Sequence, residues 1–229
     1  MNKEILKIGI PSKGRISLES KKILKNKNLK IYSERGERDL LGKIKNKPNI
    51  QILYLHAREI IDQINFGNLD VGISGYDLLQ EADINVQKNV GIIKKLNFAH
   101  ARLVLAVREE WIDCYTTLDL DEIANDFRKK NKKLIKIGTK YPNNTRDFLY
   151  SKGVTQFEIV KSLGATELMP GGINTASVVS DITSSGATLK ANKLKILNDG
   201  EILQSQACLL VAKKNQNKKG IKNLIKLIS

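Results

Sequence analysis

The sequence predicts an α/β protein, in which short buried strands alternate with helices along the chain. Short β-branched runs that end in Gly, Pro or hydroxyl residues are typical of buried strands that enter tight turns. Several of these turns lead into segments with helix start signals. Apolar residues make up 41% of the 229 residues, which favours a globular protein over a disordered one. A chain of this length can form one large domain or two lobes.

The N-terminal half begins with a strand at residues 5–10, and the turn from Pro11 to Arg15 then opens a helix at residues 16–25. A second region of strand, small-residue turn and helix surrounds Gly72 and Gly75. Residues 101–107 form an apolar strand that we expect to carry the chain from one lobe into the other. The other elements expected here are strands at 50–55 and 90–95, a charged loop at 34–39 and a helix at 57–66.

The C-terminal half repeats the alternation. Expected elements are helices at 119–131 and 145–151, strands at 134–139, 157–160, 176–182, 195–197 and 207–212, a helix start at 188–192 and a turn at 199–201. The last residues, 213–229, predict a helix with an apolar stripe formed by Ile221, Leu224, Ile225 and Ile228. Such a stripe either packs on its own domain or meets another subunit.

Composition argues against several classes of protein. The net charge of +15 allows a nucleic-acid-binding protein, but the lysines are scattered and few aromatic residues lie among them. Two cysteines, Cys114 and Cys208, and two histidines, His56 and His100, indicate neither a disulfide framework nor a zinc site. No apolar stretch has the length of a signal peptide or a membrane span, so we expect a cytoplasmic protein.

The most informative stretch follows the strand at 176–182. Asp181 closes this strand, and a loop of small and hydroxyl residues runs from Thr183 to Thr188 before a helix begins. Backbone N–H groups, hydroxyl donors and a helix N-terminus suit a phosphate. Asp181 could hold ribose hydroxyls or a metal. An ordinary turn and helix cap would show the same local pattern.

Residues 167–189 resemble the phosphoribosyl pyrophosphate (PRPP) signature of the ATP phosphoribosyltransferase family, which catalyses the first step of histidine biosynthesis. The positions that agree with the signature are Glu167, Pro170, Ala176, Asp181, Gly186, Thr188 and Leu189. Ser177 replaces an acid that is usual in the family, and Ser180 replaces an aliphatic residue.

Three further segments resemble the same family. Ser12, Lys13 and Arg15 match a segment that faces the nucleotide substrates, although a surface turn with solvated cations would look alike. Around Ser74 and Gly75 the pattern follows the family's Asp-x-Gly-Ile-Thr-Gly-x-Asp, with serine in place of threonine. Residues 139–146, which include Lys140 and Tyr141, match the family at every position but its wildcard. Family members also place an arginine that reaches a phosphate of PRPP in the loop at 34–39, and the resemblance implies Arg38 for this role, with Arg35 close behind. A merely solvent-exposed loop would carry the same charges.

The resemblance implies a two-lobed fold of the type II periplasmic-binding-protein kind, with the active site in the cleft between the lobes. We expect residues 1–97 and 190–229 to form lobe I and residues 98–189 to form lobe II. It also implies the short form of the enzyme, which self-associates and works with a regulatory subunit similar to histidyl-tRNA synthetase. Nucleic-acid and membrane partners are not expected.

The reaction implied is transfer of the 5-phosphoribosyl group from PRPP to N1 of ATP with release of pyrophosphate. Lys13, Arg15 and Arg38 would stabilise the leaving pyrophosphate, together with Mg²⁺ that we expect to be held through PRPP rather than by protein side chains. The remaining roles are PRPP binding by Glu167, Asp181, Thr183, Ser184, Ser185, Gly186, Ala187 and Thr188, and ATP binding or lining of the cleft by Ser12, Ser74, Gly75, Lys140 and Tyr141. The alternative is a two-lobed module that binds a small molecule without catalysis.

Overall fold

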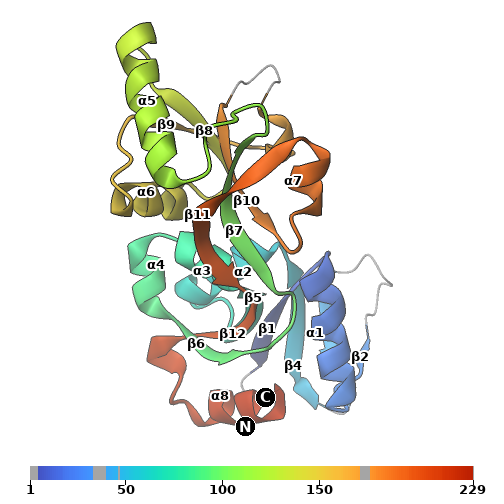
Figure 1. Cartoon of the computed structure of the whole chain (residues 1–229). Coiled ribbons are helices and arrows are strands. Elements are labelled where there is room, and N and C mark those ends of the chain that lie inside the picture. Colours follow the sequence, from blue (N-terminus) through green and yellow to red (C-terminus); the bar gives the residue numbers. More distant parts are fainter. Residues whose placement is uncertain (1–4, 33–39, 46, 171–175, 229) are drawn as a thin grey trace. The chain divides into compact units, whose positions relative to one another are not determined.

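The computed structural model describes residues 5–32, 40–45, 47–170 and 176–228 (Figure 1). The chain divides into two compact units: unit 1 contains Met1–Ala99 and Gln206–Ser229, and unit 2 contains His100–Ser205. The first crossing lies two residues after the expected boundary at 97/98. The second crossing was expected after Leu189 but follows Ser205, because β11 (Leu194–Ser205) pairs with β7 (Ala101–Arg108) inside unit 2.

In the described part of unit 1, seven strands form one sheet in the order β2-β3-β4-β1-β5-β12-β6. The central strand β1 is parallel to β4 and β5, whereas β12 is antiparallel to β5 and β6. The strands are β1 (Leu6–Pro11), β2 (Ile31–Tyr32), β3 (Leu41–Ile44), β4 (Lys47–Leu55), β5 (Val71–Gly75), β6 (Val90–Lys95) and β12 (Ala207–Ala212). Because parallel strands end at the same edge, the turns after β1, β4 and β5 lie together.

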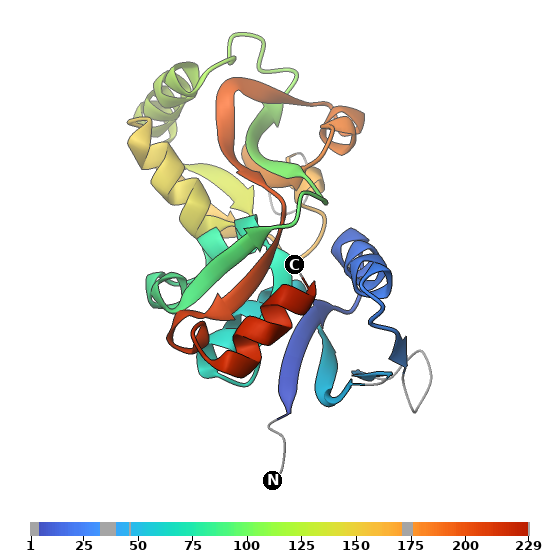
Figure 2. The same ribbon diagram turned by 90° about the horizontal axis from the view of Figure 1, so that it is seen from below.

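Helices cover both faces of this sheet. One face packs against α1 (Arg15–Asn26) and α8 (Lys219–Ile228), which share a core cluster with strands β1, β4, β5 and β12 (Figure 2). The other face packs against α2 (Ala57–Phe66), α3 (Tyr76–Glu81) and α4 (Ile84–Asn89). In α8, Ile221, Leu224 and Ile228 are buried in the core of their own unit. The apolar stripe of the C-terminal helix therefore packs within its own domain.

Unit 2 contains a second sheet, in which the described strands have the order β11-β7-β10-β8-β9. Strands β8 (Ile135–Thr139), β9 (Phe157–Lys161) and β10 (Val178–Thr183) are parallel, and β7 is antiparallel to β10. One face packs against α5 (Thr117–Asn131) and α6 (Pro142–Ser151). The opposite face packs against α7 (Ala187–Ala191) and Met169, which follows the 3-10 turn η1 (Thr166–Leu168). The loops after β8, β9 and β10 consequently share one edge.

The turn expected at residues 199–201 is wrong. β11 runs through these residues as one strand, with irregular pairing to β7 between Ile196 and Leu203. Gly200 lies close to β7, because a Cβ there would sit 3.1 Å from the carbonyl oxygen of Leu105. The backbone thus needs glycine for close packing rather than for chain reversal.

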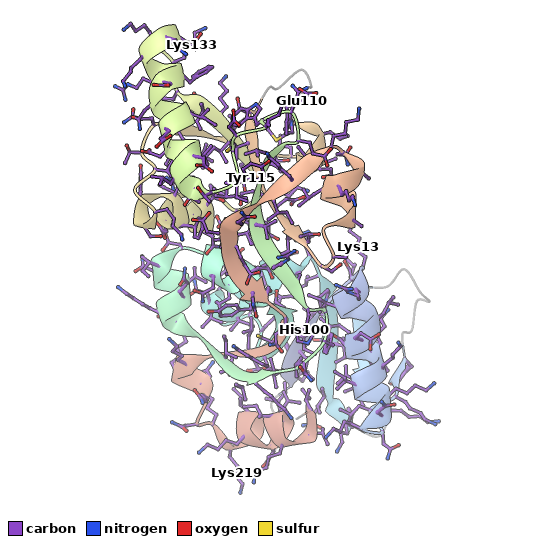
Figure 3. The ribbon with its side chains drawn as sticks, in the orientation of Figure 1. Lys13, His100, Glu110, Tyr115, Lys133 and Lys219 are labelled. Carbon is purple, nitrogen blue, oxygen red and sulfur yellow. The ribbon has the colours of Figure 1, made fainter. Side chains whose placement is uncertain are left out.

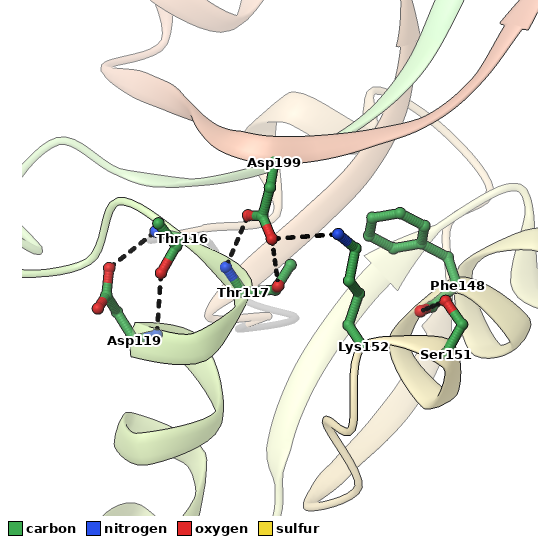
Figure 4. Close-up of polar contacts among 7 residues, drawn as sticks. All are labelled: Thr116, Thr117, Asp119, Phe148, Ser151, Lys152 and Asp199. Carbon is green, nitrogen blue, oxygen red and sulfur yellow. Dashed lines mark hydrogen bonds and ion pairs between the residues drawn. The ribbon is translucent and has the colours of Figure 1, made fainter.

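Asp199 on β11 holds the start of α5 (Figure 4). Its carboxylate accepts hydrogen bonds from the Thr117 amide at 2.8 Å and the Thr117 hydroxyl at 2.5 Å, and Lys152 Nζ lies 3.3 Å away. Partial burial alone would raise the pKa of Asp199, but these donors outweigh it and the pKa is lowered. A capping box between Thr116 and Asp119 completes the helix start.

Two strands and one α-helix were not expected from the sequence. Strands β2 and β3 have only two and four residues, and α4 has six, so each is too short for a clear periodic pattern. β2 and β3 extend the sheet of unit 1 at one edge, and α4 packs against α2 and β6. Across the described ranges, no helix is long and apolar enough to cross a membrane.

Candidate active site

The parallel strands of unit 2 bring the predicted PRPP-binding residues together at one sheet edge. Thr139, the last residue of β8, is the register partner of Ser180 on β10, so Lys140 follows β8 beside the part of β10 that contains Asp181. Side chains alternate between the two faces of a sheet. Ser180 consequently points to the face covered by α6, whereas Asp181 and Thr183 point to the face covered by η1 and α7.

Asp181 occupies a partly buried position on the second of these faces. Burial raises the pKa of its carboxyl group, and the nearby charge of Glu167 raises it further. A hydrogen bond from the backbone of Ile182 and the charge of Lys140 act in the opposite direction. Glu167 lies in η1, which packs against β10. Two carboxylates and one ammonium group therefore gather where the sequence places the ribose of PRPP.

The loop after β10 is organised by its own hydroxyl groups. The Gly186 amide donates to Thr183 Oγ1 at 2.9 Å, and the Ala187 amide donates to Ser185 Oγ at 3.3 Å. Gly186 has a φ of 80°, a left-handed conformation that glycine adopts without strain. The side chains of Ser184, Ser185 and Thr188 are exposed. The loop thus presents hydroxyl groups to solvent from a fixed backbone.

Buried hydroxyl groups connect the strands on the face behind this site. The Thr145 hydroxyl of α6 donates to Ser180 Oγ at 2.8 Å and lies 3.4 Å from Thr139 Oγ1. Thr139 Oγ1 also accepts a hydrogen bond from the Tyr141 amide at 2.9 Å. Thr139, Thr145 and Ser180 are all fully buried. This hydroxyl network joins the segments that carry Lys140 and Asp181, so it fixes their relative position.

Tyr141 was expected to line the ligand site, but only 6% of its surface is exposed. Its amide donates the hydrogen bond to Thr139 Oγ1 that shapes the turn before α6. Lys140, in contrast, is exposed at the same turn. Of this pair, Lys140 is the residue placed to meet an anion.

In unit 1, Ser12, Lys13 and Arg15 lie at the turn after β1, where the Ser12 amide donates to the Leu55 carbonyl at 2.8 Å. All three side chains are exposed, and Gly14 between them has a φ of 85°. Figure 3 shows Lys13 at the N-terminal end of α1. Cationic side chains and free helical N–H groups at this position suit an anionic ligand.

Ser74 and Gly75 are both buried at the end of β5. Ser74 is fully buried, and its hydroxyl donates to the Ala57 carbonyl at 2.7 Å, which holds β5 against the start of α2. Gly75 is also buried, and a Cβ there would collide with the carboxylate of Asp77. The Ser74 hydroxyl is thus already used inside unit 1, and a role of Ser74 or Gly75 at a ligand stays a prediction. Arg35 and Arg38 lie outside the described residues.

Arg102, which lies beside the 183–188 loop, was not predicted as a site residue from the sequence. Arg102 on β7 is the register partner of Thr183, and its Nη1 lies 3.4 Å from Glu201 Oε2. Nothing in the local sequence reveals this pairing, because the two residues belong to distant strands. Within the described residues, no three side chains from His, Cys, Asp and Glu gather closely enough to hold a metal ion.

The fold is shared by proteins of the periplasmic-binding-protein type. A substrate-binding protein of an amino-acid ABC transporter has a TM-score of 0.55 at 13% identity, covering 98% of this chain and 91% of that one. The arginine-binding protein from Thermotoga maritima has a TM-score of 0.52 at 14% identity, covering 98% and 87%. This chain is thus a two-lobed α/β protein of that class, and its site residues are suited to an anionic, hydroxyl-bearing ligand. The expected fold class is confirmed.

Sequence comparison identifies the family within that class. Residues 56–229 match the family model described as "HisG: ATP phosphoribosyltransferase". The chain is 39% identical over 223 residues to ATP phosphoribosyltransferase from Nitrobacter winogradskyi, covering 97% of this chain and 68% of that protein. It is 37% identical over 218 residues to the enzyme of the same name from Brucella suis, covering 95% and 94%. The chain belongs to the ATP phosphoribosyltransferase family.

A solved member of the family has the same fold. The ATP phosphoribosyl transferase (HisG:HisZ) complex from Thermotoga maritima contains a chain with a TM-score of 0.73 at 23% identity, covering 98% of this chain and 96% of that one. The expectation of a pentosyltransferase that performs the first step of histidine biosynthesis is confirmed, and the binding-module alternative receives no support.

Proposed function

We propose that this chain transfers the 5-phosphoribosyl group of PRPP to N1 of ATP, with the edge of unit 2 as the PRPP site. The observation that carries this assignment is the arrangement of Glu167, Asp181, Lys140 and the 183–188 loop at one edge of one sheet. Carboxylates accept hydrogen bonds from ribose hydroxyls. Hydroxyl groups of the adjacent loop donate to the 5-phosphate.

Each residue has a role that follows from its position. Asp181 and Glu167 orient the ribose, and the loop from Thr183 to Thr188 binds the phosphate. Breaking the bond between C1 and the pyrophosphate oxygen builds positive charge on the sugar and negative charge on pyrophosphate. Lys13 and Arg15 stabilise that negative charge, and Arg38 is proposed for the same role from the sequence alone. The carboxylates of Asp181 and Glu167 also favour the positively charged sugar.

The acceptor needs little help from the protein. N1 of adenine carries no proton at neutral pH, so its lone pair can attack C1 without a general base. The acceleration then depends on holding the two anionic substrates in line and on preorganised charge. The proposed reaction therefore does not require a His–Asp pair as general base.

Magnesium is proposed to enter the site with PRPP. Mg²⁺ prefers oxygen ligands and often bridges one or two carboxylates and substrate phosphates. PRPP itself offers such phosphate oxygens, so we expect the ion to be held through PRPP, while Asp181 and Glu167 keep their role at the ribose. Held in this way, Mg²⁺ would neutralise charge on the leaving pyrophosphate.

We also propose a regulatory partner. The Thermotoga maritima protein is a complex of HisG and HisZ, and this chain matches the fold of that family over nearly its whole length. A partner similar to histidyl-tRNA synthetase would carry the histidine response. Histidine should then inhibit the complex and not bind to this chain alone, which calorimetry with histidine and the isolated chain can check.

The assay mixes the purified chain with ATP, PRPP and Mg²⁺, with and without the regulatory subunit, and follows phosphoribosyl-ATP by ultraviolet absorbance. Asp181→Asn and Glu167→Gln should raise KM for PRPP by about 10-fold or more, because each removes a charged acceptor. Asp126→Asn is a matched control, since Asp126 is an exposed carboxylate on α5 near Lys129. Unchanged kinetics in the two site variants would refute the PRPP assignment.

A further inference from the structure

Arg102 is the cation that lies closest in the strand register to the phosphate-binding loop. It stands opposite Thr183, the residue whose hydroxyl accepts the Gly186 amide and fixes the loop. Side chains of directly opposed residues in an antiparallel pair point to the same face, with Cβ atoms about 5 Å apart. The Arg102 side chain therefore starts on the face that carries Asp181 and Thr183.

The ion pair between Arg102 and Glu201 is long and partly exposed to solvent. The Arg102 guanidinium lies 3.4 Å from Glu201 Oε2, and the two side chains retain 40% and 38% of their exposure. The other carboxylate oxygen of Glu201 accepts a hydrogen bond from Gln204 at 2.9 Å. A half-exposed ion pair of this length contributes little to folding, so an incoming anion can replace Glu201 at low cost. Gln204 would keep Glu201 satisfied after the exchange.

The charge balance of the site supports this exchange. The proposed PRPP site places the carboxylates of Asp181 and Glu167 on the same face as the loop, with Lys140 as a nearby cation. A phosphate dianion would add two negative charges to this region. An arginine can meet two phosphate oxygens with a pair of parallel N–H donors, which neither the hydroxyl groups nor Lys140 can do.

We propose that Arg102 binds the 5-phosphate of PRPP, and that Glu201 holds its guanidinium beside the loop until the phosphate displaces it. This inference rests on the PRPP assignment made above and adds a binding residue from β7, a strand that the sequence pattern did not connect with the site.

The chain offers a matched control on the same strand. Arg108 also belongs to β7 and pairs with Glu110 at 2.7 Å, with 41% of its side chain exposed. It stands opposite Leu194 at the other end of the strand. Arg102→Gln and Arg108→Gln therefore remove the same charge from similar ion pairs, and they differ in distance from the loop.

Steady-state kinetics at low ionic strength test the proposal. Arg102→Gln should raise KM for PRPP by about 10-fold or more and leave KM for ATP within about twofold. Arg102→Lys should give an intermediate KM because it keeps the charge but loses the paired donors. Arg108→Gln should leave both constants within about twofold.

Glu201→Gln should lower KM for PRPP, since it frees the guanidinium of Arg102. A rise in KM for PRPP with Glu201→Gln similar to that of Arg102→Gln would mean that the pair is structural, and would overturn the proposal.

A binding measurement without turnover separates phosphate recognition from other effects. Calorimetric titration with ribose 5-phosphate should show weaker binding to Arg102→Gln, whereas titration with ribose should show no change. Equal losses for both probes would contradict a role at the phosphate. Thr183→Ala and Thr188→Ala distinguish a failure of the PRPP assignment from a failure of the role of Arg102. If they raise KM for PRPP and Arg102→Gln does not, only the role of Arg102 fails. If the loop variants also have no effect, the PRPP assignment itself fails.

Discussion

The buried hydroxyl network behind the site makes a quantitative prediction. Thr145→Val keeps the shape of the side chain but removes the donor that Ser180 Oγ accepts at 2.8 Å. Among the described residues, Thr145 supplies the one side-chain hydrogen bond to Ser180 Oγ, whereas Thr139 Oγ1 also accepts from the Tyr141 amide. Leaving a buried hydroxyl unsatisfied costs about 1–3 kcal/mol. For a protein of this size, that loss should lower the unfolding temperature by roughly 2–12 °C.

A double-mutant cycle isolates this contact. If the loss comes from the orphaned hydroxyl of Ser180, then removing that hydroxyl as well should recover part of the stability, because a pair of apolar side chains needs no hydrogen bond. The double variant Thr145→Val with Ser180→Ala should therefore be more stable than the sum of the single variants predicts, by about 1 kcal/mol or more. Differential scanning fluorimetry and urea unfolding measure the four proteins. Strict additivity would refute the argument that this hydrogen bond matters.

The kinetic effect of the same change reports on positioning. The network joins the segments that carry Lys140 and Asp181, so Thr145→Val should raise KM for PRPP more than KM for ATP. Thr145→Ser keeps the donor and should restore KM for PRPP, even though the lost methyl group reduces stability. If the serine and valine variants lose PRPP affinity equally, packing rather than the hydroxyl group controls the site.

Two further predictions follow from the carboxylates of unit 2. Burial raises the pKa of Asp181, so the folded protein binds the carboxyl proton more tightly than the unfolded chain does. As pH rises above the ordinary aspartate pKa, the Asp181 carboxylate therefore lowers the free energy of unfolding. Asp181→Asn should therefore raise the unfolding temperature at neutral pH, and this gain should shrink as pH falls, although the same change weakens PRPP binding. A lower unfolding temperature at neutral pH would contradict this. The pKa of Asp199 is lowered instead, so its stabilising contribution is present above the ordinary aspartate pKa and disappears as pH falls through the lowered value. Asp199→Asn should lower the unfolding temperature at neutral pH, and the difference from the native protein should narrow in acid, as a fluorimetric pH series can measure.

Local signals in the sequence were enough to locate most elements. The helix expected at residues 57–66 is confirmed with the same bounds, because His56 caps its start and Gly67 ends it with a φ of 83°. Its apolar residues Ile60, Ile61 and Ile64 are buried, as helical periodicity requires. The strand that leads to Asp181 was equally clear, since a β-branched run ends there in hydroxyl residues and glycine.

What the sequence could not reveal depends on contacts between distant segments. The small residues around Ser74 are typical of a turn that lines a ligand site. Only the structure shows that the Ser74 hydroxyl donates to the Ala57 carbonyl inside unit 1. Asp199 and Gly200 look like a turn, but β11 continues through them between two segments that pair with β7, and the register shifts between Ile196 and Glu201. The pairing of Arg102 with Thr183 is likewise a property of the sheet order and leaves no local pattern.

Ser180 illustrates how a departure from the family pattern can be accommodated. The family usually has an aliphatic residue at this position, and a lone serine in a fully buried strand would leave a polar group without a partner. Here the strand directs Ser180 toward α6, where the Thr145 hydroxyl lies 2.8 Å away. Asp181, the next residue, points to the opposite face. The alternation of β10 therefore lets one strand hold a structural hydroxyl on one side and, on the other, the carboxylate that we propose for ribose binding. A change at Ser180 should accordingly alter PRPP binding only through the position of Asp181, not through a contact of its own.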